Sequence, residues 1–233
     1  MKLLLILLVL INTALAKYSC NINPISVAFK QEMIKKNSWH KGCPIELNEL
    51  SYVKVKYYNF DSQESTGALI VNNKIADITC KIFQELYNIK YPIEKIHPVS
   101  YYNANDELSM KNNNTSAFNC RLMTGSSSKW SNHSYGLAID INPLINPYLS
   151  KHGNVSPKNA KRFVLRKHTS NNVFDKAKLV KGDTTIKVFK HYGFIWGGDW
   201  KSIKDFQHFE YKPRQKNHIK TIFENLHKHK DLF

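Results

Sequence analysis

Two short segments, far apart in the chain, carry side chains that could bind a metal ion and activate water. The first contains His133 and Asp140, and the second contains Asp205 and His208. Imidazole and carboxylate groups are common zinc ligands, and a hydrolytic zinc site uses three protein ligands and keeps a fourth position for water. We therefore predict that His133, Asp140 and His208 bind one Zn²⁺ per chain, with the Asp205 carboxylate beside it.

A carboxylate and a cation near such a site would complete the chemistry of hydrolysis. Asp205 precedes His208 by three residues, and its carboxylate could take a proton from the zinc-activated water as that water attacks a carbonyl. The negative charge that develops on the carbonyl oxygen needs a positive group or hydrogen-bond donors. Arg121 is the candidate for this role, and it could instead bind a substrate carboxylate in a bidentate manner.

The offset of seven residues between His133 and Asp140 indicates that a turn separates them. On an unbroken strand an odd offset points two side chains to opposite faces. Gly136 gives the backbone the freedom for an irregular turn that brings both to one ion. Each residue taken singly has an ordinary alternative, because a buried histidine is usually a core residue and a lone Asp or Arg often serves a turn or a surface ion pair. The prediction depends on their joint occurrence.

Hydrophobic periodicity predicts the elements that must position these residues. The predicted elements are a short helix over 27–33, strands over 53–57 and 67–72, a helix from about 73 to 90, a strand over 118–123 that carries Arg121, a helix over 184–191, and strands over 194–196 and 207–211. The polar, asparagine-rich stretch 101–117 is expected to be a long loop. The basic stretch 151–181 is expected to be an exposed excursion at the rim of the site or simply a solvated loop. The spacing of apolar residues over 219–226 predicts a terminal helix packed on the body.

The N-terminus has the three parts of a secretory signal. A positive start at Lys2 is followed by an apolar run from Leu3 to Ile11 and an Ala-x-Ala end at Ala16. The run is too short to span a bilayer core of about 30 Å, so we predict cleavage after Ala16 and no permanent membrane span. A buried N-terminal helix is the alternative. The predicted organisation is a signal peptide (1–16), an N-terminal subregion (17–60), a catalytic domain (61–211) and a basic C-terminal helix or tail (212–233).

The four cysteines, Cys20, Cys43, Cys80 and Cys120, all follow the predicted signal. Export makes disulfides possible, and four cysteines permit three pairings that sequence alone does not distinguish. Their spacing favours a local Cys20–Cys43 bridge and a longer Cys80–Cys120 bridge. No C-x-x-C pair occurs, so a cysteine-based zinc site is not expected.

The chain of 233 residues has a formal net charge of +16, which creates a field that attracts polyanions. For an exported protein these include anionic cell-wall polymers, anionic lipid and extracellular nucleic acid. No recognition helix, zinc finger or aromatic-basic motif is found, so specific nucleic-acid binding is not expected. Asn132 begins an N-x-[ST] sequon beside a predicted metal ligand, where a glycan would obstruct the site. This favours a bacterial envelope over a glycosylating secretory pathway.

The pattern Ser131-x-His133-x-x-Gly136-x-Ala138-x-Asp140, followed by Gly-Gly-Asp-Trp at 197–200 and Asp-x-x-His-Phe-Glu at 205–210, resembles the zinc D-alanyl-D-alanine carboxypeptidase family. That family also includes D-Ala-D-Ala dipeptidases and L-alanyl-D-glutamate endopeptidases. The resemblance extends from about residue 67 to 211. It implies that His133, Asp140 and His208 are the zinc ligands, that Asp205 is the acid/base carboxylate, and that Arg121 stabilises the substrate or its oxyanion. Ser131 and Glu210 also match motif positions and are expected to support the ligands.

The resemblance further implies an α+β fold, with a small antiparallel β-sheet and flanking helices, of the hedgehog and D-Ala-D-Ala-peptidase type. The implied function is that of a zinc peptidase acting on the stem peptides of peptidoglycan. The N-terminal signal predicts that the protein is secreted or periplasmic, the positive charge predicts an anionic wall polymer as a further partner, and we expect a monomer. Both a D-Ala-D-Ala carboxypeptidase and an L-Ala-D-Glu endopeptidase remain open, and the Asp at position 205 favours the endopeptidase branch. The alternative is a non-catalytic, zinc-containing wall-binding module on the same scaffold.

Overall fold

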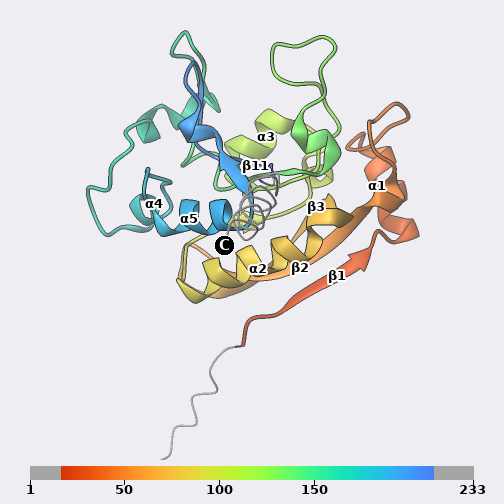
Figure 1. Ribbon diagram of the computed structural model, residues 1–233, viewed down its shortest axis with the longest axis horizontal. Coiled ribbons are helices and arrows are strands. Elements are labelled where there is room, and N and C mark those ends of the chain that lie inside the picture. Colours follow the sequence, from red (N-terminus) through yellow and green to blue (C-terminus); the bar gives the residue numbers. More distant parts are fainter. Residues whose placement is uncertain (1–16, 213–233) are drawn as a thin grey trace, which may run out of the picture.

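This computed structural model describes residues 17–212 and begins with a three-stranded antiparallel sheet in the order β1-β2-β3 (Figure 1). Its strands are β1 (Cys20–Pro24), β2 (Leu50–Tyr58) and β3 (Glu64–Asn72), and α1 (Val27–Lys35) lies in the connection between the first two. Val53 and Val55 of β2 are fully buried while Lys54 between them is exposed, as the alternating sequence predicts. The predicted helix and both predicted strands are therefore confirmed, and the hairpin of β2 and β3 extends across residue 60.

Both faces of this sheet contribute to hydrophobic clusters. One face is covered by α2 (Ala76–Asn88), whose buried Ile82, Phe83 and Leu86 recur at helical spacing. The helix follows a short 3₁₀ turn, η2 (Asn73–Ile75), where the Asn72 side chain accepts a hydrogen bond from the backbone of Lys74. The other face packs on a smaller cluster that includes Met33 of α1.

A second antiparallel sheet, in the order β6-β11-β9, lies beside the first and carries the proposed metal ligands. Its strands are β6 (Ala138–Asp140), β9 (Phe194–Trp196) and β11 (His208–Tyr211), and α5 (Thr184–His191) precedes β9. The rings of Phe189 in α5 and Phe209 in β11 stack with centroids 3.8 Å apart. Both rings belong to the same core as Val53 and Leu86, so one continuous core joins the two sheets.

Short strands complete the fold. A third antiparallel sheet contains β10 (Lys204–Asp205), β7 (Tyr148–Leu149) and β8 (Val155–Ser156), and β4 (Lys95–Ile96) pairs in parallel with β5 (Asn114–Thr115). The mixture of helices with small, mainly antiparallel sheets confirms the predicted α+β class. Within residues 17–212, no helix has the length and apolar character needed to cross a membrane.

The stretch 101–117, expected to be a loop, contains a helix instead. After η3 (Val99–Tyr102), α3 (Asp106–Lys111) begins with the Asn105 side chain accepting a hydrogen bond from the backbone N–H of Leu108. This N-cap and the two acids in the first turn satisfy and stabilise the helix start. The predicted loop is therefore wrong, because its polar residues act as a cap and a first turn.

The predicted strand over 118–123 is also absent. The backbone N–H of Phe118 donates to Ile70 and that of Cys120 donates to Ser38, while Leu122 forms only an isolated bridge with Trp130. Because these hydrogen bonds go to different partners, they form no continuous ladder. The segment is nevertheless fixed at several points along its length.

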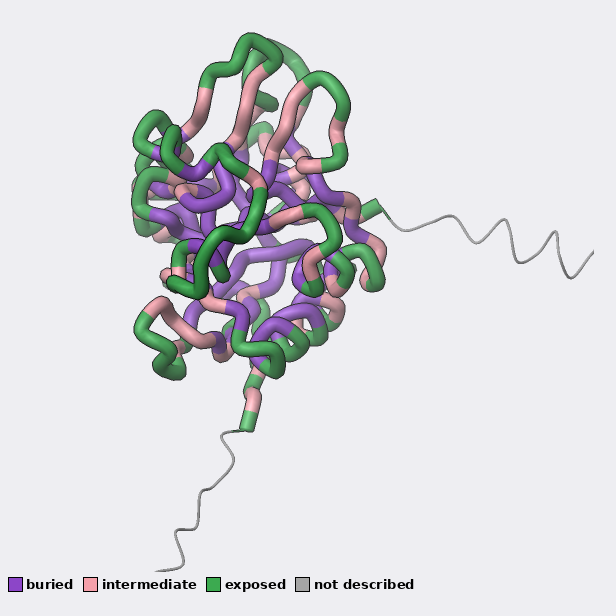
Figure 2. Tube along the Cα trace, turned by 90° about the vertical axis from the view of Figure 1, so that its left-hand side faces the viewer, coloured by how far each residue is buried: buried purple, intermediate pink, exposed green. Residues whose placement is uncertain are grey.

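The basic stretch 151–181 is partly folded and partly exposed (Figure 2). It contains β8, a 3₁₀ helix η5 (Lys158–Phe163) and the short α4 (Val173–Lys176). Phe163 and Ala177 form a small buried cluster with Ile145. The stretch is thus more than a solvated loop. The predicted helix over 219–226 and the predicted signal at 1–16 lie outside the described residues.

The disulfides pair as Cys20–Cys80 and Cys43–Cys120, so the pairing favoured by spacing is wrong. Helix α2 packs against β1 and β2, which brings Cys80 to Cys20 with their Cα atoms 5.7 Å apart. The Tyr18 hydroxyl donates a hydrogen bond to the Cys80 carbonyl at the same place. The tertiary packing of a helix on a sheet, and not distance along the chain, therefore determines which cysteines meet.

Candidate metal centre

His133, Asp140 and His208 converge at one buried point, as predicted. The distance from His133 Nε2 to His208 Nδ1 is 3.1 Å, and the Asp140 carboxylate lies 3.2 Å from the first nitrogen and 3.1 Å from the second. All three residues are buried, with exposed fractions of 4 to 6 %. Ligand atoms about 2.0–2.2 Å from a tetrahedral zinc lie about 3.3–3.6 Å from one another, so these separations are close to those of three zinc ligands.

The outer nitrogen of each imidazole is already engaged. His133 Nδ1 hydrogen-bonds the carbonyl oxygen of Ala117, and His208 Nε2 lies 3.4 Å from Glu210 Oε2. With protons on these outer nitrogens, the inner nitrogens and the Asp140 carboxylate direct three lone pairs at one point. This arrangement is repulsive unless a cation or a proton lies between them. The donor set therefore fits a divalent metal ion, and these hydrogen bonds fix which nitrogen of each ring would bind it.

A 3₁₀ helix, η4 (Asn132–Tyr135), positions His133. The Ser131 side chain accepts a hydrogen bond from the His133 backbone N–H, and Gly136 ends the helix with φ +65°. A Cβ atom at Gly136 would lie 2.6 Å from the backbone nitrogen of Asn72, so a side chain there meets both strain and a clash. The predicted turn at Gly136 is therefore the feature that lets His133 and Asp140 face the same point.

Register in the second sheet positions the other two residues. His208 of β11 lies directly opposite Asp140 of β6, so the two side chains lie on the same face of the sheet. Glu210, two residues further along β11, contacts three groups: His208 Nε2, Asn132 Nδ2, and Lys212 Nζ at 2.6 Å. Burial opposes ionisation of Glu210, but these neighbours outweigh it and lower its pKa to about 2. Glu210 is therefore an anion that holds His208.

Asp205 faces the same cavity as the three proposed ligands. It lies in β10 opposite Tyr148 of β7, and Gly197 packs against it so closely that a Cβ atom there would be 2.5 Å from the Asp205 carbonyl oxygen. Within residues 17–212, its buried Oδ1 atom has no hydrogen-bond partner. Burial raises the pKa of Asp205 to about 6, although the charge of His208 opposes the shift. A buried, unpaired carboxylate oxygen beside the triangle is suited to accept a proton.

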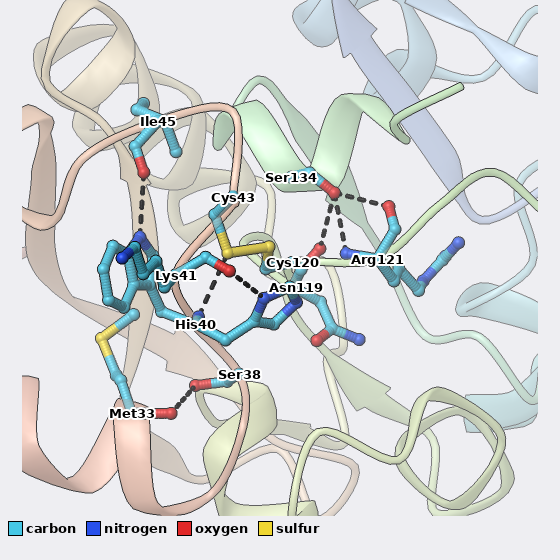
Figure 3. Close-up of a disulfide and its surroundings, with 11 residues drawn as sticks. Met33, Ser38, His40, Lys41, Cys43, Ile45, Asn119, Cys120, Arg121 and Ser134 are labelled. Atoms are coloured by element: carbon cyan, nitrogen blue, oxygen red, sulfur yellow. Dashed lines mark hydrogen bonds between the residues drawn. A yellow bond between two sulfur atoms is a disulfide. The ribbon is translucent and has the colours of Figure 1, made fainter. Parts of the chain in front are cut away.

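Arg121 also lines the cavity, and its backbone is firmly anchored. The Ser134 hydroxyl accepts from the Arg121 N–H at 2.8 Å and lies 2.6 Å from the Arg121 carbonyl, and the Cys43–Cys120 disulfide holds the preceding residue (Figure 3). The side chain extends away from the disulfide, and its guanidinium lies 2.9 Å from the Asp106 carboxylate. The positively charged Arg121 thus lines the cavity, where it forms an ion pair with Asp106 of α3.

Several cavity residues were not predicted from the sequence. They are Asp106 and Met110 of α3, Tyr148 of β7, Ser156 of β8, and Trp200 and Gln207 near the last strand. The Trp200 ring lies 5.3 Å from the His208 ring, whereas Trp196 is a core residue at 2 % exposure. The Asn105 cap followed by acids is the signal that could have located α3 and with it Asp106.

An α+β fold with two buried imidazoles and a carboxylate around one point, and a free carboxylate beside them, defines a candidate metallohydrolase. Residues 124–211 match the family model described as D-alanyl-D-alanine carboxypeptidase, which supports the family resemblance predicted from the motifs. The match indicates a peptidase, and it includes all three proposed ligands and Asp205, while Arg121 lies just before it. No solved structure matches the chain.

Proposed function

We propose that this protein is an exported zinc metallopeptidase that hydrolyses a peptide bond in the stem peptides of peptidoglycan. The triangle of His133, Asp140 and His208, with donor separations of 3.1 to 3.2 Å inside the segment that matches the peptidase family, is the observation that carries this proposal. The fold type shared with hedgehog and D-Ala-D-Ala peptidases is part of the same proposal.

The chemistry follows from the positions of three groups. A zinc ion held by the triangle would lower the pKa of a water molecule to about 7 and polarise the scissile carbonyl. Asp205 Oδ1 accepts the proton of the attacking water and delivers it to the leaving amine. The Arg121 Nε–H, which is buried and has no partner within residues 17–212, donates to the carbonyl oxygen as it becomes negative. Ser131 and Glu210 hold His133 and His208 in place.

The setting of the enzyme is proposed from the sequence. Residues 1–16 act as a signal peptide, 17–60 as an N-terminal subregion, 61–211 as the catalytic domain and 212–233 as a basic tail. The net charge of +16 favours association with an anionic wall polymer of a bacterial envelope, where the protein acts as a monomer, secreted or in the periplasm. The two disulfides are consistent with export. N-terminal sequencing of the exported protein should give Lys17 as the first residue.

The decisive test is digestion of purified peptidoglycan by the zinc-loaded protein, with fragments identified by mass, before and after chelation. Asp205→Asn should abolish cleavage while the bound zinc, measured by atomic absorption, is unchanged. Asp61→Asn, at an exposed site in the turn between β2 and β3, is the matched control and should behave as wild type. Zinc-loaded wild-type protein that binds peptidoglycan and cleaves none of it would support the non-catalytic binding module instead.

A further inference from the structure

The charge of Arg121 is balanced inside the cavity. Its Nη2 atom lies 2.9 Å from Asp106 Oδ2, and the two side chains are only 27 and 30 % exposed. The second oxygen of Asp106 lies 3.4 Å from the Asn119 side-chain nitrogen, so a further residue holds the carboxylate. Asp106 stands in the first turn of α3, which Asn105 caps. The pair is therefore built into the fold and is not a chance contact between two flexible surface chains.

The described lining of the cavity offers no second permanent cation. Besides the two histidines of the triangle, its positive side chain is Arg121, and its carboxylates are those of Asp106, Asp140, Asp205 and Glu210. A peptide that ends in a free carboxylate needs an unpaired cation, preferably a guanidinium that can bind both oxygens. Here the carboxylate of Asp106 already occupies that guanidinium.

A neutral peptide group meets a different environment. The Arg121 Nε–H is buried and has no hydrogen-bond partner within residues 17–212, so it is the donor of this side chain that would pair with an uncharged carbonyl oxygen once the side chain turns toward a bound peptide. The cavity walls come from two sides, with Met123 and Trp130 from the loop that follows Arg121 and Tyr148 and Ser156 from the β7–β8 hairpin. These two loops extend from the same side of the molecule (Figure 1). Side chains from both loops line the cavity, so a bound peptide would contact both of them.

We propose that Asp106 determines substrate preference by neutralising Arg121, so that the enzyme cleaves internal bonds of peptides whose chain continues beyond the cleaved bond. This inference rests on the proposed peptidase function and goes beyond it, because it selects endopeptidase over carboxypeptidase action. Asp106 acts through Arg121 and is a specificity-determining residue; Arg121 is the group that contacts the substrate.

The test uses two synthetic stem peptides of the same sequence, one ending in a carboxylate and the other in a carboxamide. The cleaved bond is identified by mass, and kcat/KM is measured for each peptide. The wild-type enzyme should cleave internal bonds of both peptides and should not release the C-terminal residue faster from the carboxylate form. Asp106→Asn frees the guanidinium and should raise release of the C-terminal residue from the carboxylate peptide about tenfold relative to the carboxamide peptide.

The control is Asp77→Asn, which changes an exposed aspartate in the first turn of α2 and should leave both rates unchanged. Zinc content and thermal unfolding establish that each variant is folded. Two results would overturn the inference: preferential release of the C-terminal residue from the carboxylate peptide by wild type, or an equal loss on both peptides in Asp106→Asn. In both cases the peptidase function stands. If zinc-loaded wild type cleaves neither peptide nor peptidoglycan, the proposed function itself fails.

Discussion

Glu210 does not touch the proposed metal position, yet its removal should weaken metal binding strongly. The carboxylate is 6 % exposed and accepts from His208 Nε2 at 3.4 Å, which orients the ring so that Nδ1 faces Asp140 and His133. In Glu210→Gln the side chain keeps its shape and loses its charge. The imidazole then loses the partner that fixes its tautomer and increases its basicity.

The expected loss can be placed between two limits. Residues that hold a metal-binding histidine contribute about 10- to 100-fold to metal affinity, which corresponds to about 1.4 to 2.7 kcal/mol. The upper part of this range is expected, because Glu210 is buried and a neutral amide would also face Lys212 Nζ, now 2.6 Å from the carboxylate. A loss above about 100-fold would indicate that the ring itself has moved.

The dissociation constant for zinc is measured by competition with a chromophoric chelator at pH 7.5. Lys212→Met is the matched control, because it removes a partner of the same carboxylate whose side chain is 60 % exposed. An exposed ion pair contributes about 0–1 kcal/mol, so this variant should bind zinc within about fivefold of wild type. Equal zinc affinity in Glu210→Gln and wild type would refute the assigned support role, as would an equal loss in both variants.

Three further predictions follow from the geometry. In Gly197→Ala the new methyl group would lie 2.5 Å from the carbonyl oxygen of Asp205 and 2.9 Å from the Cβ of Asp205, so Asp205 must shift. The kcat should therefore fall about 100-fold with zinc content unchanged, and retention of full activity would contradict the role of Asp205. Burial opposes protonation of His208, but the hydrogen bonds of the imidazole to Asp140 and Glu210 outweigh burial and raise the pKa of His208 to about 10 in the metal-free protein. Below that pH, zinc must therefore displace a proton from His208 when it binds. Zinc affinity should therefore rise about tenfold per unit between about pH 7 and 9, and calorimetry in buffers of different ionisation enthalpy should detect the released proton; an affinity independent of pH would be the opposite result. Replacing Cys43 and Cys120 by serine opens a loop that spans 77 residues and should lower the free energy of unfolding by about 4 kcal/mol in denaturant titrations, whereas a change below about 1 kcal/mol would mean that packing alone holds this region.

The metal triangle could be predicted from the sequence because local signals specify it. His133 and Asp140 lie on either side of a glycine that the turn requires, and His208 lies in a strand whose alternation sets the face it occupies. The helix over 184–191 was predictable for the same reason, since its apolar spacing and its glycine stop are local features.

The pairing of Arg121 with Asp106 could not be predicted in this way. It depends on the tertiary position of a six-residue helix within an asparagine-rich segment of weak helix propensity. The sequence predicts a strand for the extended segment that carries Arg121, but the backbone N–H groups of this segment bind separate partners. No pattern in the sequence indicates those partners. The disulfide pairing was missed for a similar reason, since it depends on how α2 packs on the sheet.

The two disulfides overlap along the chain, because Cys43 lies within the loop closed by Cys20 and Cys80, and Cys80 lies within the loop closed by Cys43 and Cys120. A single backbone cut anywhere between Cys20 and Cys120 therefore leaves two fragments that are still covalently joined, and a cut between Cys43 and Cys80 leaves them joined twice. If Cys20 were bonded to Cys43 and Cys80 to Cys120, a cut between Cys43 and Cys80 would separate the two fragments. In surroundings rich in proteases, a nicked molecule would keep its N-terminal half attached to the half that contains the catalytic centre.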